Sequence, residues 1–422
     1  MMRFAYFGFP HVGGTHTVFR QLHAGLAPYG VTVRWLGMAP AALAAAEDPK
    51  WAADIALGRV VGHAGASPQA QAAALVHAVA AGGYDGVFVN VCADRVQMNI
   101  ARYLPAHVLR IMIVHNITPG TYAAARAIRD HVHATVGVSE RCRSDLVERH
   151  GFAAERMSVI PHAFEAGALP GERPARRGEG CRLLFLGRVE DTAKGVFWLP
   201  RILERLPASA TLTVAGDGPD LPRLARQLAR FPDRVRLAGM VAPDEVGELV
   251  RGHDLLLAPS RFEGFGLSML EAMAGGCVPV ASHIHGVTDT IVDDGVDGFL
   301  FPVGDWRRAA AHVEALMADP LLLSAASAAA MGKARRAFGL NAMAARYAGL
   351  IGALASAPPA IAAPLELGQW SMPPGMRDGW RTALPQPVKN ALRLLRERLA
   401  GNGPAQGLPG GPRAIRRHFE AR

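Results

Sequence analysis

The sequence of 422 residues contains few cysteines, and their positions do not suggest a covalent framework. Cys92, Cys142, Cys181 and Cys277 are far apart and form no C-x-x-C pair. This spacing argues against a disulfide scaffold and against a zinc site built on cysteine. Scattered reduced thiols are the expected state.

Long apolar runs are also missing. No stretch of about 20 apolar residues is present, so we expect no segment that spans a bilayer. At the N-terminus one basic residue, Arg3, precedes a short apolar run that Pro10 ends, and no small-residue cleavage site follows. This pattern does not match a secretory signal, and a cytoplasmic protein is expected.

Two phosphate-binding motifs are lacking as well. The chain has no G-x-x-x-x-G-K-[ST] segment, which argues against a P-loop ATPase. The pair Gly216 and Gly218 resembles the start of a dinucleotide fingerprint, but Leu221 stands where the third glycine belongs. Charged residues make up only 19% and hydrophobic residues 50%, so the chain can form ordinary cores and is not largely disordered.

Positive charge is concentrated at the C-terminal end. The formal charge is +9, and residues 376–422 carry ten Lys/Arg against three Asp/Glu, a net +7. Within this tail Val388, Leu392, Leu395 and Leu399 form a helical apolar stripe. The tail indicates an anionic surface, and the stripe either lies on a membrane or packs on the protein. Few aromatic residues are interleaved with the charge, so nucleic acid is not an expected partner.

The first part of the chain alternates strand and helix patterns. A strand at 3–8 leads through a glycine-containing turn to a helix at 17–29 and a strand at 31–37, which is one βαβ unit. Further buried strands are expected at 86–91, 109–115 and 135–139, followed by a helix at 140–150. A segment rich in Gly, Pro and charge at 164–180 fits a linker.

After this linker the pattern starts again. Strands are expected at 182–187, 211–216, 235–239, 254–260 and 278–282, with helices between them and the first helix running to about residue 206. Alternating strands and helices predict an α/β fold in which two doubly wound, Rossmann-like domains face each other across a cleft. We assign 1–170 to the N-terminal domain and 171–340 to the C-terminal domain. A helix at 341–363 should pack back on the N-terminal domain, and 364–422 form the basic extension.

Ligands in open parallel sheets bind beyond the carboxyl ends of the strands. In the second domain these ends are followed by small residues (Gly187, then Gly216 to Pro219, then Gly239 to Val241), by the cations Arg188 and Lys194, and by Ser260 and Glu263. Cations bind phosphates, glycines allow the backbone to approach a ligand closely, and a carboxylate can accept hydrogen bonds from hydroxyl groups. The set predicts a site for a nucleoside diphosphate.

Glu263 and Glu271 are eight residues apart. On one continuous helix they would lie about 12 Å apart and roughly 80° around the axis, so they would not share a face. Gly264 and Gly266 predict a loop, and Ser268 is a suitable N-cap with Glu271 at the third helical position. The amides around Leu267 to Leu270 would then form an anion site, with a carboxylate on each side.

These residues fall within a longer resemblance. The stretch 263–282 resembles the E-x7-E signature of the family 4 retaining glycosyltransferases of the GT-B fold. Three further segments resemble that family in the correct order, namely 136–162, LGRVEDTAKG and 293–305. The resemblance is continuous from about 135 to 318, weaker from 1 to 110, and does not cover the tail.

The resemblance implies a metal-independent hexosyl transfer from a UDP- or GDP-sugar with retention of configuration, and no cofactor or metal. The acceptor would be a glycan, as in polysaccharide biosynthesis. The basic tail and the absence of a spanning segment point to a lipid-linked glycan, with the protein cytoplasmic or peripheral at the inner face of the plasma membrane. Arg188 and Lys194 would hold the diphosphate, Glu263 the donor sugar and Glu271 the ribose. The base would stack between the Gly216 loop and Met240 with Val241. Gly13, Gly14 and His115 would approach the donor from the first domain, and Gly266, Leu267 and Ser268 would line the anion site.

Other interpretations stay open from the residues alone. Glu271 could act only as a cap, His115 as a hydrogen-bonded structural residue, and Gly13 with Gly14 as a tight turn. A sugar-nucleotide epimerase on a similar fold and a non-catalytic nucleotide-sugar-binding relative are the rival functions. Asp293, Asp294 and Asp297 lack calcium-loop spacing and are expected in a solvated loop.

Overall fold

The computed structural model describes residues 1–91, 94–164 and 180–377, together with isolated positions between 379 and 395. The described residues form two compact units. The first contains Met1–Ala163 and Phe338–Arg377, and the second is built on the segment that ends at Ala337. Cys92, the expected linker and most of the basic tail lie outside the described residues.

The first unit is built on a parallel sheet of seven strands in the order β3-β2-β1-β4-β5-β6-β7. The strands are β1 (Met2–Phe7), β2 (Val31–Met38), β3 (Gly58–Val61), β4 (Gly86–Val91), β5 (Leu109–Val114), β6 (Ala134–Gly137) and β7 (Met157–Val159). Every residue of β4 and β5 is buried, because helices cover a parallel sheet on both faces. The order reverses between β1 and β4, where a doubly wound sheet opens its ligand-binding crevice.

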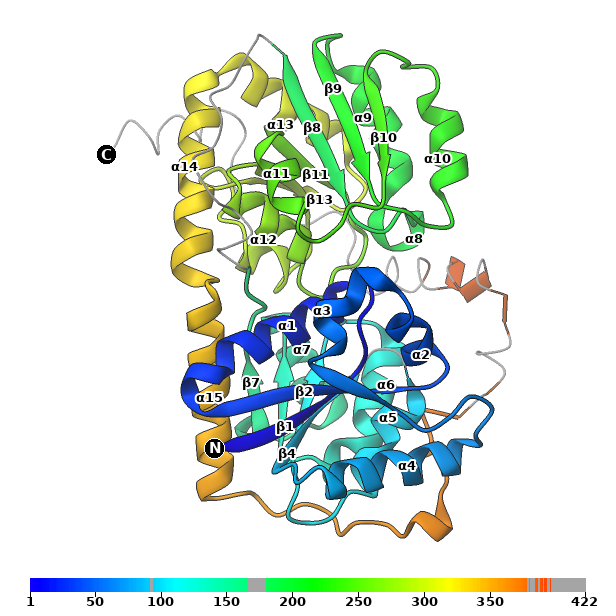
Figure 1. Ribbon diagram of the computed structural model, residues 1–422. Coiled ribbons are helices and arrows are strands. Elements are labelled where there is room, and N and C mark those ends of the chain that lie inside the picture. The colour runs from blue at the N-terminus through cyan, green and yellow to red at the C-terminus, as the bar shows by residue number, and fades with distance from the viewer. Residues whose placement is uncertain are drawn as a thin grey trace. The chain divides into compact units, whose positions relative to one another are not determined.

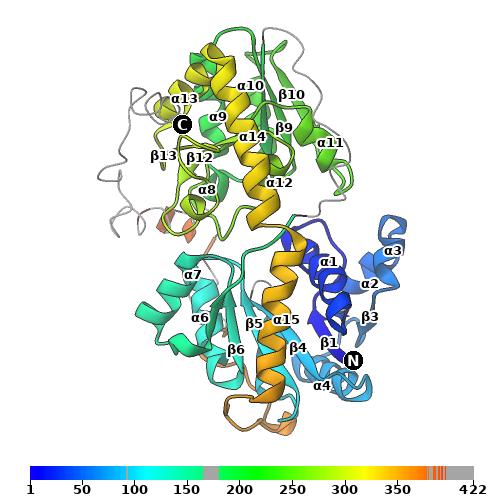
Figure 2. The ribbon, with the colours of Figure 1, turned by 90° about the vertical axis from the view of Figure 1, so that its left-hand side faces the viewer.

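Short helices connect the strands of the first unit. They are α1 (Gly14–Leu26), α2 (Ala41–Ala46), α3 (Ala52–Ile55), α4 (Pro68–Ala81), α5 (Arg95–Asn99), α6 (Pro119–Ile128) and α7 (Glu140–Ser144). A later helix, α15 (Leu340–Ser356), packs against α1, as Figure 2 shows. Gly25 makes this packing possible, since a Cβ there would lie 2.9 Å from the Cβ of Ala344.

The second unit repeats the design with six parallel strands in the order β10-β9-β8-β11-β12-β13 (Figure 1). The strands are β8 (Cys181–Leu186), β9 (Ala210–Ala215), β10 (Val235–Gly239), β11 (Leu255–Ala258), β12 (Val278–His283) and β13 (Phe299–Pro302). The order reverses between β8 and β11, which are hydrogen-bonded neighbours. Loops that follow these two strands therefore leave the same edge of the sheet side by side.

Helices pack on this sheet, and several of them share a buried apolar core. They are α8 (Asp191–Lys194), α9 (Leu199–Arg205), α10 (Leu221–Leu228), α11 (Val246–Arg251), α12 (Leu267–Ala274), α13 (Trp306–Ala318) and α14 (Pro320–Ala337). Phe185 and Leu257 from the sheet, together with Leu199, Val313 and Leu316 from the helices, belong to this buried core. The repeated α/β pattern confirms the prediction of two Rossmann-like units.

The expected strands are all present, and each end lies within two residues of its expected position. The sequence interpretation missed β3, β7 and β13, which have three or four residues and too little alternation to be noticed. The prediction of one helix from β8 to about residue 206 is wrong. Gly195, with a φ of 62°, ends α8 after four residues, and α9 starts only at Leu199.

Two other expectations concern the state of the cysteines and the absence of membrane-spanning segments. Cys142, Cys181 and Cys277 are buried free thiols. Among the described residues no single helix is long and apolar enough to cross a bilayer, although α13 and α14, bent by 107° at their junction, satisfy that test together.

Candidate functional site

The loops after β8 and β11 bring a cation and a carboxylate together. Lys194 ends α8, and its Nζ donates to Glu263 Oε2 at 2.7 Å. Ser260 Oγ donates to the same oxygen at 3.1 Å. The exposed fractions of the Lys194 and Glu263 side chains are 21% and 15%, so both are largely shielded from solvent.

A second set of contacts holds this pair in place. The backbone N–H of Arg261 donates to Ala193 O at 2.7 Å, which ties the β11 loop to α8. The Arg261 guanidinium donates to Asp191 Oδ2 at 3.0 Å and lies 3.8 Å from the centre of the Trp198 ring. These contacts join the two loops that carry Lys194 and Glu263.

Arg188 occupies a different position. Its side chain is 67% exposed, and Nε lies 3.4 Å from Glu190 Oε2. Exposed ion pairs of this kind are worth little, so the guanidinium can leave Glu190 for a stronger anion at small cost. Arg188 and Lys194, which were both expected to hold the diphosphate, thus have different partners: Arg188 pairs with Glu190, and Lys194 pairs with Glu263.

The loop after β9 approaches the loop after β8 very closely. Gly216 has a φ of 139°, and a Cβ at this position would lie 1.8 Å from Gly187 O. Val189 N–H donates to Asp217 O at 2.9 Å, which joins the two loops further along. Only glycine fits at Gly216, and the backbone there lies next to the residues that precede Arg188.

The start of α12 differs from the prediction. The helix begins at Leu267, and its N-cap is Gly266 with a φ of 109° and no side-chain capping bond. Ser268 is therefore the second helical residue and Glu271 the fifth, so the predicted capping box is wrong. Gly266 adopts a left-handed conformation that Ser268 would not, and this starts the helix two residues earlier.

This earlier start limits the amides that α12 can offer. Met269 N–H and Leu270 N–H both donate to Gly266 O, at 3.0 and 3.2 Å. The predicted anion site over Leu267 to Leu270 is thus reduced to the amides of Leu267 and Ser268. Glu271 lies half-buried one turn further along the helix.

The residues expected to contact a base follow β10. The Met240 side chain is 61% exposed, which is unusual for a large apolar residue, and Val241 is half-buried. The backbone N–H of Gly216 donates to Gly239 O at 2.7 Å, so this loop adjoins the Gly216 loop. An exposed apolar surface beside a glycine loop is suited to a flat ring.

In the first unit His115 follows β5 and is hydrogen-bonded. Asn90 Nδ2 donates to Phe7 O at 2.9 Å, which turns Asn90 Oδ1 towards His115 Nε2 at 2.8 Å. The ring of His115 also stacks on His162 with 5.5 Å between ring centres. Burial lowers the pKa of His115 to about 4, so the ring is neutral near pH 7, with the proton on Nε2 and Nδ1 as an acceptor.

Gly13 and Gly14 lie at the start of α1 and are exposed. Gly13 O accepts the N–H groups of His16 and Thr17, at 3.1 and 3.3 Å, so the glycines form the turn that leads into the helix. His115 is thus a hydrogen-bonded residue, and Gly13 with Gly14 form a tight turn. Neither structural role prevents these residues from binding a ligand.

Several neighbours of the site were not singled out from the sequence. Arg261 and Asp191 were missed because their partner residues are distant in the chain. Asn90 could have been noticed, since it is the one polar residue in the apolar strand GVFVNV. The expectation of a solvated loop is wrong for Asp297, which is buried and lies 3.4 Å from Lys333 Nζ.

Comparison with known proteins finds a family match within the second unit. Residues 180–319 match the family model described as glycosyl transferases group 1. The chain is 26% identical over 241 residues to an alpha-D-kanosaminyltransferase of Streptomyces kanamyceticus, covering 54% of this chain and 62% of that protein. It is 32% identical over 200 residues to a D-inositol 3-phosphate glycosyltransferase of Geodermatophilus obscurus, covering 43% and 44%. The matched region thus spans less than two thirds of these relatives.

Solved structures resemble the chain over a greater length. Anabaena HepE in complex with UDP and glucose superposes with a TM-score of 0.70 and 18% identity, over 84% of this chain and 100% of that one. Sucrose-phosphate synthase from Thermosynechococcus elongatus gives a TM-score of 0.71 and 18% identity, over 85% and 100%. At this level of identity the likeness concerns the fold.

Proposed function

Since this chain belongs, through residues 180–319, to the glycosyl transferases group 1 of the GT-B fold, we propose that it transfers a hexosyl group from a UDP- or GDP-sugar to a glycan, with retention of configuration. The observation that carries this proposal is the ion pair of Lys194 with Glu263, 2.7 Å apart where the strand order of the second unit reverses. A cation for phosphate and a carboxylate for sugar hydroxyls then adjoin each other.

The first part of the reaction is departure of the nucleoside diphosphate. As the glycosidic bond breaks, negative charge grows on the β-phosphate oxygen. In this proposal Lys194 Nζ and the exposed Arg188 guanidinium stabilise that charge. A preorganised positive charge acts more strongly in the transition state than in the ground state, and no metal is required for the step.

Recognition of the nucleotide would use the loops after β9 and β10 and the start of α12. The amides of Leu267 and Ser268 would donate to phosphate oxygens, next to Gly266. Glu271 would accept hydrogen bonds from the ribose hydroxyls. The base would lie between the Gly216 loop and the apolar pair Met240 and Val241.

The sugar would be held by Glu263 near the reacting carbon. The acceptor hydroxyl would attack from the face that the diphosphate leaves, which retains the anomeric configuration. His115 Nδ1 would accept a hydrogen bond from a sugar hydroxyl, consistent with the tautomer that Asn90 imposes. Gly13 and Gly14 would allow the first unit's loop to approach the donor without side-chain obstruction.

The donor and acceptor classes have different support. UDP is favoured because Anabaena HepE, a structural neighbour, was crystallised with UDP and glucose. A lipid-linked glycan at an anionic membrane surface is proposed from the basic residues 376–422, which lie mainly outside the described residues. Flotation with anionic vesicles, with and without those residues, tests this part, and equal lack of binding would overturn it.

The donor proposal is tested by thermal stabilisation of the protein across a panel of UDP-, GDP- and ADP-sugars. We expect a shift with a UDP- or GDP-sugar, since a ligand that binds only the folded state raises its stability. The absence of a shift with every compound would contradict the proposal.

The rival functions are separated by an acceptor-omission assay. An epimerase would release UDP or free sugar without an acceptor, whereas a transferase needs the acceptor for turnover. A non-catalytic relative would bind the nucleotide-sugar and never release UDP at a useful rate. The presence of Arg188, Lys194, Glu263 and Glu271 favours the transferase.

A further inference from the structure

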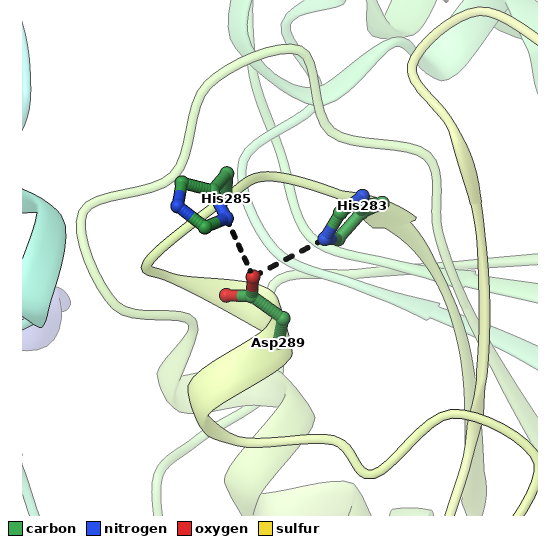
Figure 3. A group of neighbouring side chains, drawn as sticks. All are labelled: His283, His285 and Asp289. Atoms are coloured by element: carbon green, nitrogen blue, oxygen red, sulfur yellow. Dashed lines mark hydrogen bonds and ion pairs between the residues drawn. The ribbon is translucent and has the colours of Figure 1, made fainter. Parts of the chain in front are cut away.

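Three side chains meet at the carboxyl end of β12, outside the residues given a role above. His283 Nε2 lies 3.2 Å from Asp289 Oδ2, and His285 Nδ1 lies 3.1 Å from the same oxygen. All three ligand atoms lie within 4.8 Å of one another. Figure 3 shows both imidazole rings turned towards the carboxylate, with the two contacts drawn as dashed lines.

The local fold explains this convergence. His283 is the last residue of β12, and His285 follows two residues later in the turn. A hydroxyl group fixes the turn: Thr288 Oγ1 donates to Ser282 O at 2.8 Å and accepts the N–H of Ile284 at 2.7 Å. Asp289, the next residue, is thereby held opposite both rings.

We propose that His283, His285 and Asp289 bind one divalent transition-metal ion, with zinc as the best-suited ion. Two imidazole nitrogens and one carboxylate oxygen form a set that zinc accepts, with water in a fourth position. Magnesium and calcium prefer oxygen ligands and do not suit this set.

The distances fit such a site. Bonds of about 2.0–2.1 Å to a tetrahedral ion place neighbouring ligand atoms roughly 3.3 Å apart. The separations of 3.2 and 3.1 Å already correspond to two edges of that tetrahedron. The third edge can close by rotation of His285, whose side chain is 85% exposed and therefore little restrained by packing.

One ion would take the place of the hydrogen bonds now shared with Asp289. Without metal, Asp289 Oδ2 accepts a hydrogen bond from each ring. Metal binding requires both facing nitrogens to be unprotonated, so uptake releases protons when the rings are charged. The side chains that hold the hydrogen-bonded cluster therefore need little rearrangement to hold an ion.

The role inferred for the ion is local stiffening of the β12 turn. Ile291, two residues after Asp289, has its Cδ1 3.8 Å from the point that a Cβ of Gly266 would occupy. An ion that joins the end of β12 to this turn would thus support the start of α12. The site holds no predicted phosphate ligand, so it does not rest on the proposed transfer reaction.

The test is a titration of the full chain with Zn²⁺. The protein is first treated with a chelator, and Zn²⁺ is then added in competition with a chromogenic chelator near neutral pH. We expect one tight site in the wild type. His285→Ala should lower the Zn²⁺ affinity by at least roughly 10- to 100-fold. A loss of that size is typical when a residue that only hydrogen-bonds to a metal ligand is removed.

Two further variants make the outcome decisive. His77→Ala removes an exposed histidine from α4 and should bind Zn²⁺ as the wild type does. Asp289→Asn should match His285→Ala, and cobalt absorption bands of the wild type should change in both. Because His285 is exposed, its variant should melt like the wild type in the absence of metal. Equal Zn²⁺ affinity in wild type and His285→Ala, or no stoichiometric uptake by the wild type, would overturn the proposal.

Discussion

Lys194 Nζ donates a hydrogen bond to Glu263 Oε2 across 69 residues of sequence, at a distance of 2.7 Å. The two side chains neutralise each other in a largely shielded position. In a bound nucleotide-sugar, the diphosphate would contact Lys194 and the sugar hydroxyls would contact Glu263. Substitution of each residue in turn tests these two contacts separately.

Replacing the cation should weaken nucleotide binding. In Lys194→Ala we expect UDP or GDP affinity to fall by about 10- to 100-fold, because a hydrogen bond to a charged group is worth roughly 1.5–3 kcal/mol. Isothermal titration calorimetry measures the change. Arg226→Ala, which removes an exposed cation from α10, serves as the control and should bind the nucleotide unchanged.

Replacing the carboxylate should affect transfer rather than nucleotide binding. Glu263→Ala should abolish hexosyl transfer, while the affinity for the nucleoside diphosphate falls only a few-fold, roughly 1 kcal/mol, because Glu263 is assigned to the sugar and Lys194 remains to bind the phosphates. Glu263→Gln should behave alike in transfer. Detectable transfer at the wild-type rate in the alanine variant would show that the role given to Glu263 is wrong.

The close approach of two loops predicts a stability effect. Gly216→Ala places a Cβ 1.8 Å from Gly187 O, so the loops must separate, and we expect a loss of roughly 3 kcal/mol in the free energy of unfolding. Gly349→Ala is the matched control. Gly349 lies within α15 with no heavy atom within 4 Å of its Cβ position, so alanine should stabilise by about 1 kcal/mol. Denaturant melts decide between these outcomes.

A buried histidine predicts a pH dependence of stability. Burial, and next the charges of Arg110 and Arg156, lower the pKa of His133 to about 4. The folded protein therefore binds fewer protons here than the unfolded chain, whose histidine titrates at about 6.5. Stability from this group is complete above pH 6.5 and is lost as the pH falls towards 4, on the order of 3 kcal/mol.

The variant His133→Asn checks this assignment. His133 Nδ1 accepts the N–H of Arg110 at 3.0 Å, and an asparagine oxygen can accept the same bond without titrating. Unfolding free energies between pH 7 and pH 4 should fall less steeply in the variant than in the wild type. Identical slopes would contradict the role given to His133.

The sequence alone predicts the doubly wound α/β architecture of both units. The segments GVFVNV and LRIMIV are mostly apolar, with one polar residue each, and near-continuous apolar runs are typical of strands in a parallel sheet that helices cover on both faces. It also placed Lys194 and Glu263 after strand ends, where parallel sheets collect their binding residues.

Which of these residues are in contact depends on the tertiary fold. Pairing of β8 with β11 brings Lys194 to Glu263, while Arg188 turns to Glu190. Gly266 starts α12 before Ser268, against the capping pattern, because its backbone conformation depends on the surrounding loop. His283, His285 and Asp289 meet through a turn that Thr288 fixes. Such contacts depend on strand order and loop conformation, and local sequence patterns predict neither of them.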